Sequence, residues 1–192
     1  MSESTKTFAD RDQVKIRFGG SGGQGAVLAA TILGEAAVQS GLFAAGSSSY
    51  GSRARGGAAS SDLILSPRAI DYPHVSRPDI LAALSQEACD ESSGKVEEGG
   101  IIVYDPFFIK QVREDIRQIS VGATEMMLER FGSMQGANMV MAGVVAWITG
   151  LIDSSAVFNA IASNLDERFH GQSKKAFTMG KDFAVAKKGK LW

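Results

Sequence analysis

Cysteine and histidine are scarce in this sequence, and their scarcity excludes several kinds of site. The chain has 192 residues but only one cysteine, Cys89, and two histidines, His74 and His170. One thiol cannot form an internal disulfide or hold an iron–sulfur cluster alone, and so few ligands do not predict a zinc site. We therefore expect no metal site and no catalytic residue here, and if this protein serves electron transfer, that step must occur on other chains. Cys89 has no basic neighbour in the sequence and is interpreted as a buried structural thiol.

Long apolar runs and an excess of one charge are also absent. The sequence contains no apolar run of about eighteen residues, and its polar start, MSESTKTFADRDQ, lacks the apolar core of a signal peptide. We therefore expect a cytoplasmic protein without a membrane span. The net charge of −1 provides no overall basic field for nucleic acid, so any anion site must come from a local cluster.

The length of the chain and its composition predict one domain. A chain of 192 residues suits a single α/β domain with a substantial core. Residues 1–12 are polar and are predicted to form a flexible N-terminal tail. Residues 13–192 contain neither an internal repeat nor a long linker, and they are assigned to one domain.

A glycine-rich segment near the N-terminus carries the clearest structural signal. Val14, Ile16 and Phe18 alternate with other residues, which is the period of a strand. The segment GGSGGQG follows at residues 19–25, and residues 26–41 then have apolar positions at helical spacing. A strand, a glycine turn and a helix in this order predict the opening unit of a nucleotide-binding α/β fold.

The chemistry of this loop follows from the absence of Cβ atoms. Gly20, Gly22 and Gly25 fit the dinucleotide pattern G-x-G-x-x-G, and such a backbone can present its N–H groups to a phosphate. Residues 42–50, however, contain no acidic side chain for a ribose, and no Lys-Ser/Thr pair follows the loop. Three alternatives remain: a dinucleotide, a purely structural turn, and another phosphate-bearing ligand, which the pattern favours most.

The segment SYGSRARGG is too rich in glycine, serine and arginine to predict a regular element. Arg53 and Arg55 carry planar guanidinium groups suited to phosphate or carboxylate, and hydroxyl groups on Ser48, Ser49 and Tyr50 can add hydrogen bonds. We interpret the segment as an ordered functional loop. Subunit docking with Arg55 and Tyr50 as anchors, or a solvated surface loop, remain alternatives to ligand binding.

The remaining apolar runs predict a three-layer α/β domain with a mostly parallel sheet of five to seven strands and a Rossmann-like glycine loop. Further strands are predicted at residues 42–46, 59–65, 79–84 and 100–105. Further helices are predicted at residues 85–99, 121–131, 138–149, 153–165 and 173–188.

Six segments, taken in order, resemble the γ subunits of 2-oxoacid:ferredoxin oxidoreductases. They are GGSGGQG, SYGSRARGG, SSDLILS, IDYP, RPDILAALSQEA and NMVMAGVVAWITGL, within residues 14–152, and AFTMGKDFA resembles the closing helix of that family. After SYG, many members have a Pro-Glu or similar pair, where this chain has Ser52 and Arg53. This departure leaves three alternatives open: a different substrate, a different interface, or no functional consequence.

The resemblance implies a subunit of a complex that oxidatively decarboxylates a 2-oxo acid to acyl-CoA, CO2 and reduced ferredoxin or another acceptor. Thiamine diphosphate, Mg²⁺ and [4Fe–4S] clusters would lie on partner subunits, and this chain would be inactive alone. Which 2-oxo acid is used stays open. A stand-alone nucleotide-binding oxidoreductase and a non-catalytic scaffold subunit are the alternatives.

The resemblance also assigns a role to the glycine loop, which would bind the ADP portion of coenzyme A. Arginine and tyrosine side chains of the second segment are added for their charge and hydrogen bonding. The candidate coenzyme A residues are Gly20, Ser21, Gly22, Gly23, Gln24, Gly25, Tyr50, Arg53 and Arg55.

Overall fold

A computed structural model describes residues 8–51 and 58–187 of the chain. In chain order the described elements are η1 (Phe8–Asp10), β1 (Val14–Ser21), α1 (Ala26–Gln39), β2 (Phe43–Tyr50), β3 (Ala58–Ser66), β4 (Ile80–Ala83), α2 (Gln86–Ser93), β5 (Ile101–Tyr104), β6 (Arg117–Ser120), α3 (Ala123–Phe131), α4 (Ala137–Thr149), α5 (Ser154–Asn164) and α6 (Glu167–Ala186).

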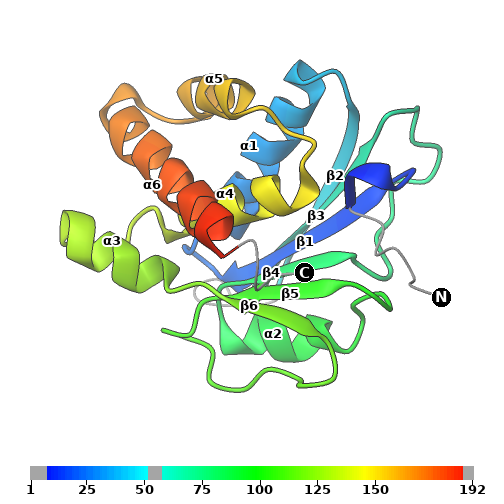
Figure 1. Cartoon of the computed structure of the whole chain (residues 1–192), viewed down its shortest axis with the longest axis horizontal. Coiled ribbons are helices and arrows are strands. Elements are labelled where there is room, and N and C mark those ends of the chain that lie inside the picture. Colours follow the sequence, from blue (N-terminus) through cyan, green and yellow to red (C-terminus); the bar gives the residue numbers. More distant parts are fainter. Residues whose placement is uncertain (1–7, 52–57, 188–192) are drawn as a thin grey trace.

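The strands form one sheet in the order β2-β3-β1-β4-β5-β6. Strands β1, β4, β5 and β6 are parallel, whereas β3 is antiparallel to both of its neighbours, β1 and β2. Helix α2 covers one face of the sheet, and α1, α4, α5 and α6 lie on the other side (Figure 1). The prediction of a three-layer α/β domain with a mostly parallel sheet is therefore confirmed.

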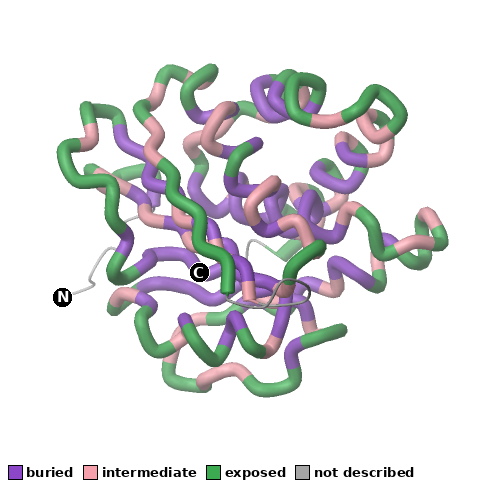
Figure 2. The backbone as a smooth tube through the Cα atoms, turned by 180° about the vertical axis from the view of Figure 1, so that it is seen from behind, coloured by how far each residue is buried: buried purple, intermediate pink, exposed green. Residues whose placement is uncertain are grey.

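The main core lies between the sheet and the helices on the side of α1. Alternate residues of β1 (Val14, Ile16 and Phe18) are fully buried there, as the period-two pattern predicted. Helix α4 is buried almost all round because it lies between the sheet and α6, and its close contact with α6 is made at Gly143 and Gly180. Figure 2 shows this buried interior in purple.

A smaller core lies on the opposite face, beneath α2. It contains Leu81 and Ala83 of β4, together with Cys89 of α2. The short β4 is buried along its whole length because helices cover both faces of the sheet at this position.

Several predicted boundaries were wrong. Ser49 and Tyr50 were predicted to belong to a loop, but they continue β2, which ends at Tyr50. Strand β6 was not predicted at all, since RQIS has only one buried side chain, Ile119. The predicted helix at residues 85–99 ends at Ser93, and the last helix begins at Glu167, before its predicted start at residue 173.

Packed structure begins inside the segment that the sequence predicts to be a tail. Phe8 is buried, and it starts the short 3-10 helix η1. Arg11 forms an ion pair with Asp79, whose other carboxylate oxygen accepts a hydrogen bond from the Lys15 N–H at 2.7 Å. These contacts join residues 8–11 to the start of β4. Residues 1–7 lie outside the described part of the chain.

Among the described helices, none combines the length and the apolar character needed to cross a membrane.

Candidate functional site

The glycine segment makes a tight turn where β1 ends. Gly19 and Gly20 belong to the strand, and the turn follows it, with the Gln24 N–H donating to the Ser21 carbonyl oxygen at 3.0 Å. Gly23 has a φ of 96°, a conformation that side chains disfavour. At Gly20, an added Cβ would lie 2.9 Å from Gln24 Oε1. Glycine is therefore required both for the turn and for its close packing.

The Gln24 side chain braces this turn against the neighbouring strand. Its Oε1 accepts a hydrogen bond from the Ser21 N–H at 2.6 Å, and its Nε2 donates to the Leu84 carbonyl oxygen at 2.8 Å. Leu84 directly follows β4, so one amide group ties the ends of two parallel strands together. Both ends of the Gln24 amide are thus used within the protein.

Gly25 joins the start of α1 to the start of α4. It precedes α1 in the left-handed conformation, with a φ of 77°. Its carbonyl oxygen accepts a hydrogen bond from Asn138 Nδ2 at 3.1 Å, and Asn138 is the second residue of α4. An added Cβ on Gly25 would lie only 2.4 Å from the same Nδ2 atom. The two helix N-termini therefore meet here because residue 25 has no side chain.

A cavity of about 450 Å³ opens at this junction. Its volume is within the range of about 300–1,000 Å³ that is usual for small-ligand sites. It lies at the carboxyl ends of parallel strands, where open α/β sheets bind ligands. The lining residues are Gly23, Gln24, Gly25, Leu28, Leu84, Phe108, Thr124, Met134, Gln135, Gly136, Ala137 and Asn138.

The described lining of the cavity carries no formal charge. It contains no Asp, Glu, Lys, Arg or His side chain, and its polar groups are amides, a hydroxyl and backbone. Helices α1 and α4 both begin here, and the first N–H groups of a helix lack intrahelical acceptors and favour anions. The arrangement can therefore bind an anion through N–H groups, beside an apolar wall that includes Leu28 and Leu84.

The buried carboxylate of Asp105 lies next to the cavity lining and forms its hydrogen bonds within the protein. Asp105 is fully buried, and its Oδ2 accepts from the Thr124 N–H at 2.8 Å and from Thr124 Oγ1 at 2.6 Å. Its Oδ1 accepts from the Phe107 N–H at 3.0 Å. Since Thr124 lies in the first turn of α3, the positive end of that helix stabilises the carboxylate. Asp105 thus fixes the start of α3 and the loop that carries Phe108.

The structure brings only part of the predicted glycine site to the cavity. Residues 23–25 line it, whereas Gly20 lies behind them in β1 and is buried. Ser21 ends β1 and forms the turn through its backbone, and Gly22 is exposed at the tip of that turn.

The predicted residues of the second segment lie elsewhere or outside the described chain. Tyr50 is 70% exposed at the end of β2. It lies at the same end of the strands as the glycine turn, but it does not line the cavity. Arg53 and Arg55 lie outside the described residues. The flanking residues Gly51 and Ala58 are joined by a backbone hydrogen bond of 2.7 Å.

Sequence reasoning missed the far side of the cavity. Asn138 lines it from α4 and Thr124 from α3, whereas Phe108 lies in the connection between β5 and β6 and Met134 in the connection between α3 and α4. One signal was available, because Asn138 is a polar residue at the start of an otherwise apolar helix and is 7% exposed. No pattern in the sequence links it to Gly25.

The only thiol lies away from this site, on α2. Cys89 is 1% exposed, and burial, with a further contribution from the negative charge of Asp90, raises the pKa of the Cys89 thiol. The raised pKa keeps the group in its unreactive neutral form around neutral pH.

We expect iodoacetamide to alkylate Cys89 at pH 8 at least about tenfold more slowly in the native protein than in urea. Mass spectrometry of quenched samples measures both rates. Equal rates would contradict the assignment of Cys89 as a buried structural thiol.

The family model for pyruvate ferredoxin/flavodoxin oxidoreductase matches residues 15–183. The chain is 34% identical over 179 residues to the 2-oxoglutarate synthase subunit KorC of Methanothermobacter thermautotrophicus, covering 89% of this chain and 95% of that subunit.

Two solved structures have the same fold. The γ subunit of a keto/oxoacid ferredoxin oxidoreductase from Geobacter sulfurreducens is 34% identical, with a TM-score of 0.81 over 92% of this chain and 98% of that chain. The 2-oxoglutarate:ferredoxin oxidoreductase of Magnetococcus marinus, solved with 2-oxoglutarate, coenzyme A and succinyl-CoA bound, also gives a TM-score of 0.81. It is 20% identical, and the match covers 92% of this chain and 32% of that chain.

Proposed function

The chain belongs to the pyruvate ferredoxin/flavodoxin oxidoreductase family, and from this premise we propose that it is the γ subunit of a 2-oxoacid:acceptor oxidoreductase. The complex would oxidatively decarboxylate a 2-oxo acid to acyl-CoA and CO2 and pass the electrons to ferredoxin or another acceptor. Thiamine diphosphate, Mg²⁺ and [4Fe–4S] clusters belong to partner subunits in this proposal. A single cysteine in the whole sequence agrees with that division, because one thiolate cannot hold a cluster.

The contribution of this chain is to bind the ADP portion of coenzyme A in the cavity beside the glycine turn. The observation that carries this proposal is the convergence of two helix N-termini, joined at Gly25 and Asn138, on an uncharged cavity. A diphosphate can accept hydrogen bonds from N–H groups there. The apolar side chains of Leu28, Phe108 and Met134 offer a surface for a planar base.

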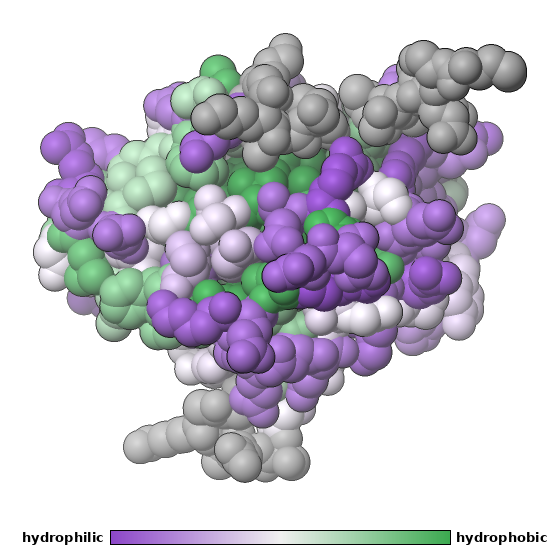
Figure 3. All heavy atoms as spheres, turned by 60° about the horizontal axis from the view of Figure 1, so that its bottom comes forward, coloured by the Kyte–Doolittle hydropathy of each residue, from purple (hydrophilic) through white to green (hydrophobic). Residues whose placement is uncertain are grey.

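Exposed apolar residues around the cavity support assembly with partners. Phe107, Phe108, Leu128 and Met134 are between 38% and 50% exposed. Figure 3 shows hydrophobic side chains, drawn green, on the left of the molecule, the side on which α3 lies in Figure 1. Large exposed apolar side chains near one site are typical of a surface that another protein covers.

A stand-alone dinucleotide enzyme is the weaker alternative, because the strand that follows α1 does not pair with β1. In a dinucleotide fold a parallel strand next to β1 supplies the acidic ribose ligand. Here the antiparallel β3 occupies that position, and β2, which follows α1, contains no acidic residue. A pure scaffold role is the second alternative. It differs from the proposed function in that a scaffold would not bind coenzyme A.

The test is a charge change at the cavity in the purified complex. Gln135 is exposed at the cavity. In the described part of the chain its backbone N–H and C=O form hydrogen bonds, so a substitution changes only its side chain. We expect Gln135→Glu to raise the KM for coenzyme A about three- to tenfold by repelling phosphate, and Gln135→Lys to lower it. Dye reduction that depends on the 2-oxo acid and on coenzyme A measures both values.

Gln111→Glu is the matched control, since Gln111 is exposed and is not part of the cavity lining. We expect this variant to leave the KM unchanged. An intact complex whose KM responds to neither substitution at Gln135 would favour the scaffold. Copurification without any thiamine-bearing or iron–sulfur subunit would contradict the γ-subunit proposal itself.

A further inference from the structure

Strand β2 forms one edge of the sheet, and within the described part of the chain half of its backbone groups have no strand partner. It pairs with β3 on one side only, in continuous antiparallel register from Phe43 opposite Ser66 to Tyr50 opposite Ala59. Seen from behind, β2 is the largely green strand in Figure 2, because most of its residues are exposed. An open edge of this length can bind another strand.

The hydrogen-bond pattern identifies which groups face outward. The Gly51 N–H donates to the Ala58 carbonyl oxygen at 2.7 Å, so residues 51 and 58 form a hydrogen-bonded pair. Such pairs alternate along an antiparallel ladder, and every second residue of β2 therefore points its N–H and C=O away from β3. The outward-facing residues are Ala44, Gly46, Ser48 and Tyr50.

This edge lacks the features that usually prevent pairing. The sequence of β2, FAAGSSSY, contains no charged residue and no proline, and its register with β3 shows no bulge. Protected edge strands are commonly short, charged or interrupted by proline. The eight residues of β2 are instead regular, uncharged and accessible along their length.

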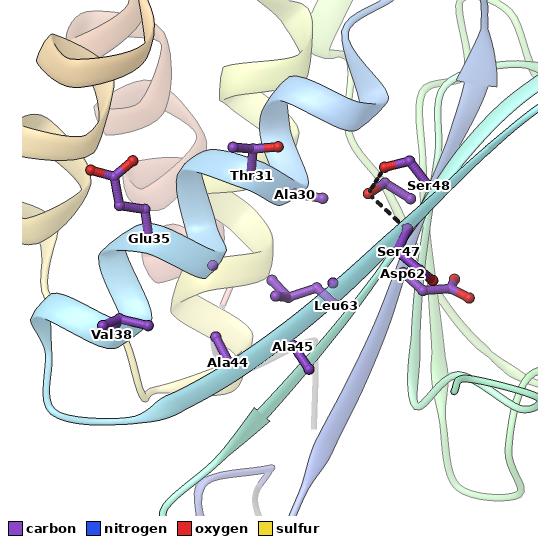
Figure 4. Close-up of a pocket in the computed structure, with 13 residues that line it drawn as sticks. Ala30, Thr31, Glu35, Val38, Ala44, Ala45, Ser47, Ser48, Asp62 and Leu63 are labelled. Atoms are coloured by element: carbon purple, nitrogen blue, oxygen red, sulfur yellow. Dashed lines mark hydrogen bonds between the residues drawn. The ribbon is translucent and has the colours of Figure 1, made fainter. Parts of the chain in front are cut away.

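A groove of about 360 Å³ runs beside the same edge, between α1 and the β2–β3 hairpin. Figure 4 shows Thr31, Glu35 and Val38 along α1 on one side of the groove and Ala44 and Leu63 on the other, with the Glu35 carboxylate at the rim, pointing away from the two strands. A strand added to β2 would place alternate side chains on the α1 side of the sheet, which is where the groove lies. Small residues line its floor and leave room for apolar side chains.

The charges of the groove define the kind of strand that fits. Glu35 and Asp62 are its charged lining residues, and both are acidic. Asp62 is already neutralised by Arg17, which donates to it at 2.6 and 2.8 Å and whose pKa is raised mainly by this hydrogen bond. Glu35 accepts hydrogen bonds only from the neutral amides of Asn164 and Gln39 in the described chain. Among the described residues no cation forms an ion pair with Glu35, so the Glu35 carboxylate can attract a cation from a bound strand.

We propose that β2 and this groove bind an extended segment of a partner subunit, which adds to the sheet as a further strand. Its main chain pairs with the outward groups of β2. Apolar side chains at alternate positions enter the groove, and a lysine or arginine among them pairs with Glu35. Backbone pairing supplies the affinity in such complexes, and the side-chain pockets supply the specificity.

A second copy of this chain fits the same edge less well. An added Cβ on Gly34 would lie 3.1 Å from Leu63, which pairs with Gly46 near the middle of β2. Two copies paired about the middle of β2 would therefore bring Glu35 of each chain toward its counterpart. Like charges facing each other in an interface are unfavourable, and β2 offers no cation to compensate them.

Hydrogen exchange of the β2 amides tests the proposal. We expect the amides of Ala44, Gly46 and Ser48 to exchange at least about tenfold more slowly in the purified complex than in the isolated chain. Unchanged exchange in an intact complex would overturn the proposal. The same protection in the isolated chain, at the mass of a dimer, would also overturn it, because the occupant would then be a second copy.

Charge variants test the predicted contact at Glu35. We expect Glu35→Lys to weaken retention of the partner segment at least about tenfold, and Glu35→Gln to have a smaller effect. The control is Glu91→Lys, an exposed acidic residue on α2, across the sheet, which should retain the partner fully. Equal loss in both lysine variants would contradict a specific contact.

A cross-link identifies the occupant. Val38 is 57% exposed at the groove and Cys89 is buried, so a maleimide-linked benzophenone labels the thiol introduced by Val38→Cys selectively. We expect the cross-linked peptide to come from a partner subunit and to combine alternating apolar residues with a lysine or arginine. A cross-link to another copy of this chain would overturn the proposal. The inference rests on the proposed function only for the existence of a partner subunit. A chain that purifies alone would refute the proposed function. A complex that forms but leaves the β2 amides unprotected from hydrogen exchange would refute only this inference.

Discussion

Replacing Gly180 with alanine is expected to lower the free energy of unfolding by about 3 kcal/mol or more, or to prevent folding. Helices α4 and α6 approach so closely that an added Cβ on Gly180 would lie 1.9 Å from the Val140 carbonyl oxygen. Gly143 makes the reciprocal contact, since its added Cβ would lie 2.1 Å from the Phe177 carbonyl oxygen. Backbone on both sides leaves no flexible side chain to move aside, so the helices must separate and open the core between them.

The same helix offers a control for that substitution. Gly171 also lies in α6, is exposed, and has nothing within 4 Å of an added Cβ. Gly171→Ala should therefore stabilise the protein by about 0.5–1 kcal/mol through helix propensity alone. Urea unfolding of both variants, followed by circular dichroism, measures the difference. A Gly180→Ala variant as stable as the native protein would contradict the close packing of α4 on α6.

Replacing Gly25 with alanine is expected to raise the KM for coenzyme A by at least about tenfold in the assembled complex, which corresponds to about 1.4 kcal/mol of binding free energy. Two effects combine at this position. Alanine is strained at a φ of 77°, and its Cβ would collide with Asn138 Nδ2 at 2.4 Å. The hydrogen bond that joins the starts of α1 and α4 would break, and the N–H groups of the two helices would no longer converge on one ligand.

Gly41→Ala is the control that separates the effect of backbone strain from the effect of disrupting the cavity. Gly41 has a φ of 87°, similar to that of Gly25, but it follows the other end of α1 and has nothing within 4 Å of an added Cβ. This variant should lose about 1 kcal/mol of stability and keep its KM. If both variants raised the KM equally, or if Gly25→Ala left it unchanged, the cavity beside the glycine turn would not be the coenzyme A site.

The order of local elements was largely readable from the sequence, because each depends on short-range patterns. The alternation of Val14, Ile16 and Phe18 identified β1, and the glycines after it identified the turn. The buried helix at residues 138–149 was predicted from its nearly continuous apolar character, and the structure has it as α4. Family membership was also readable, since it rests on short segments in a fixed order.

The cavity wall could not be read in this way, because it depends on contacts between residues far apart in the chain. Asn138 donates to Gly25 across 113 positions, and Gln24 reaches the Leu84 carbonyl oxygen across 60. No local pattern encodes such pairs, since each partner alone suits many environments. The sequence therefore identified one side of the site, and packing of α1 against α4 supplied the other.

The role of SSSY was likewise decided by tertiary structure. Serine and glycine indicate a loop by local preference, yet Ser48 pairs with Ser61 in the sheet, and their hydroxyl oxygens lie 3.0 Å apart. Strand pairing overrides weak local preference, because a neighbouring strand satisfies the backbone groups. The sequence by itself thus determined the family, the core and the glycine turn through local periodicity and chain geometry. Only the tertiary structure decided the cavity and the open edge of β2, since both arise from where distant segments meet.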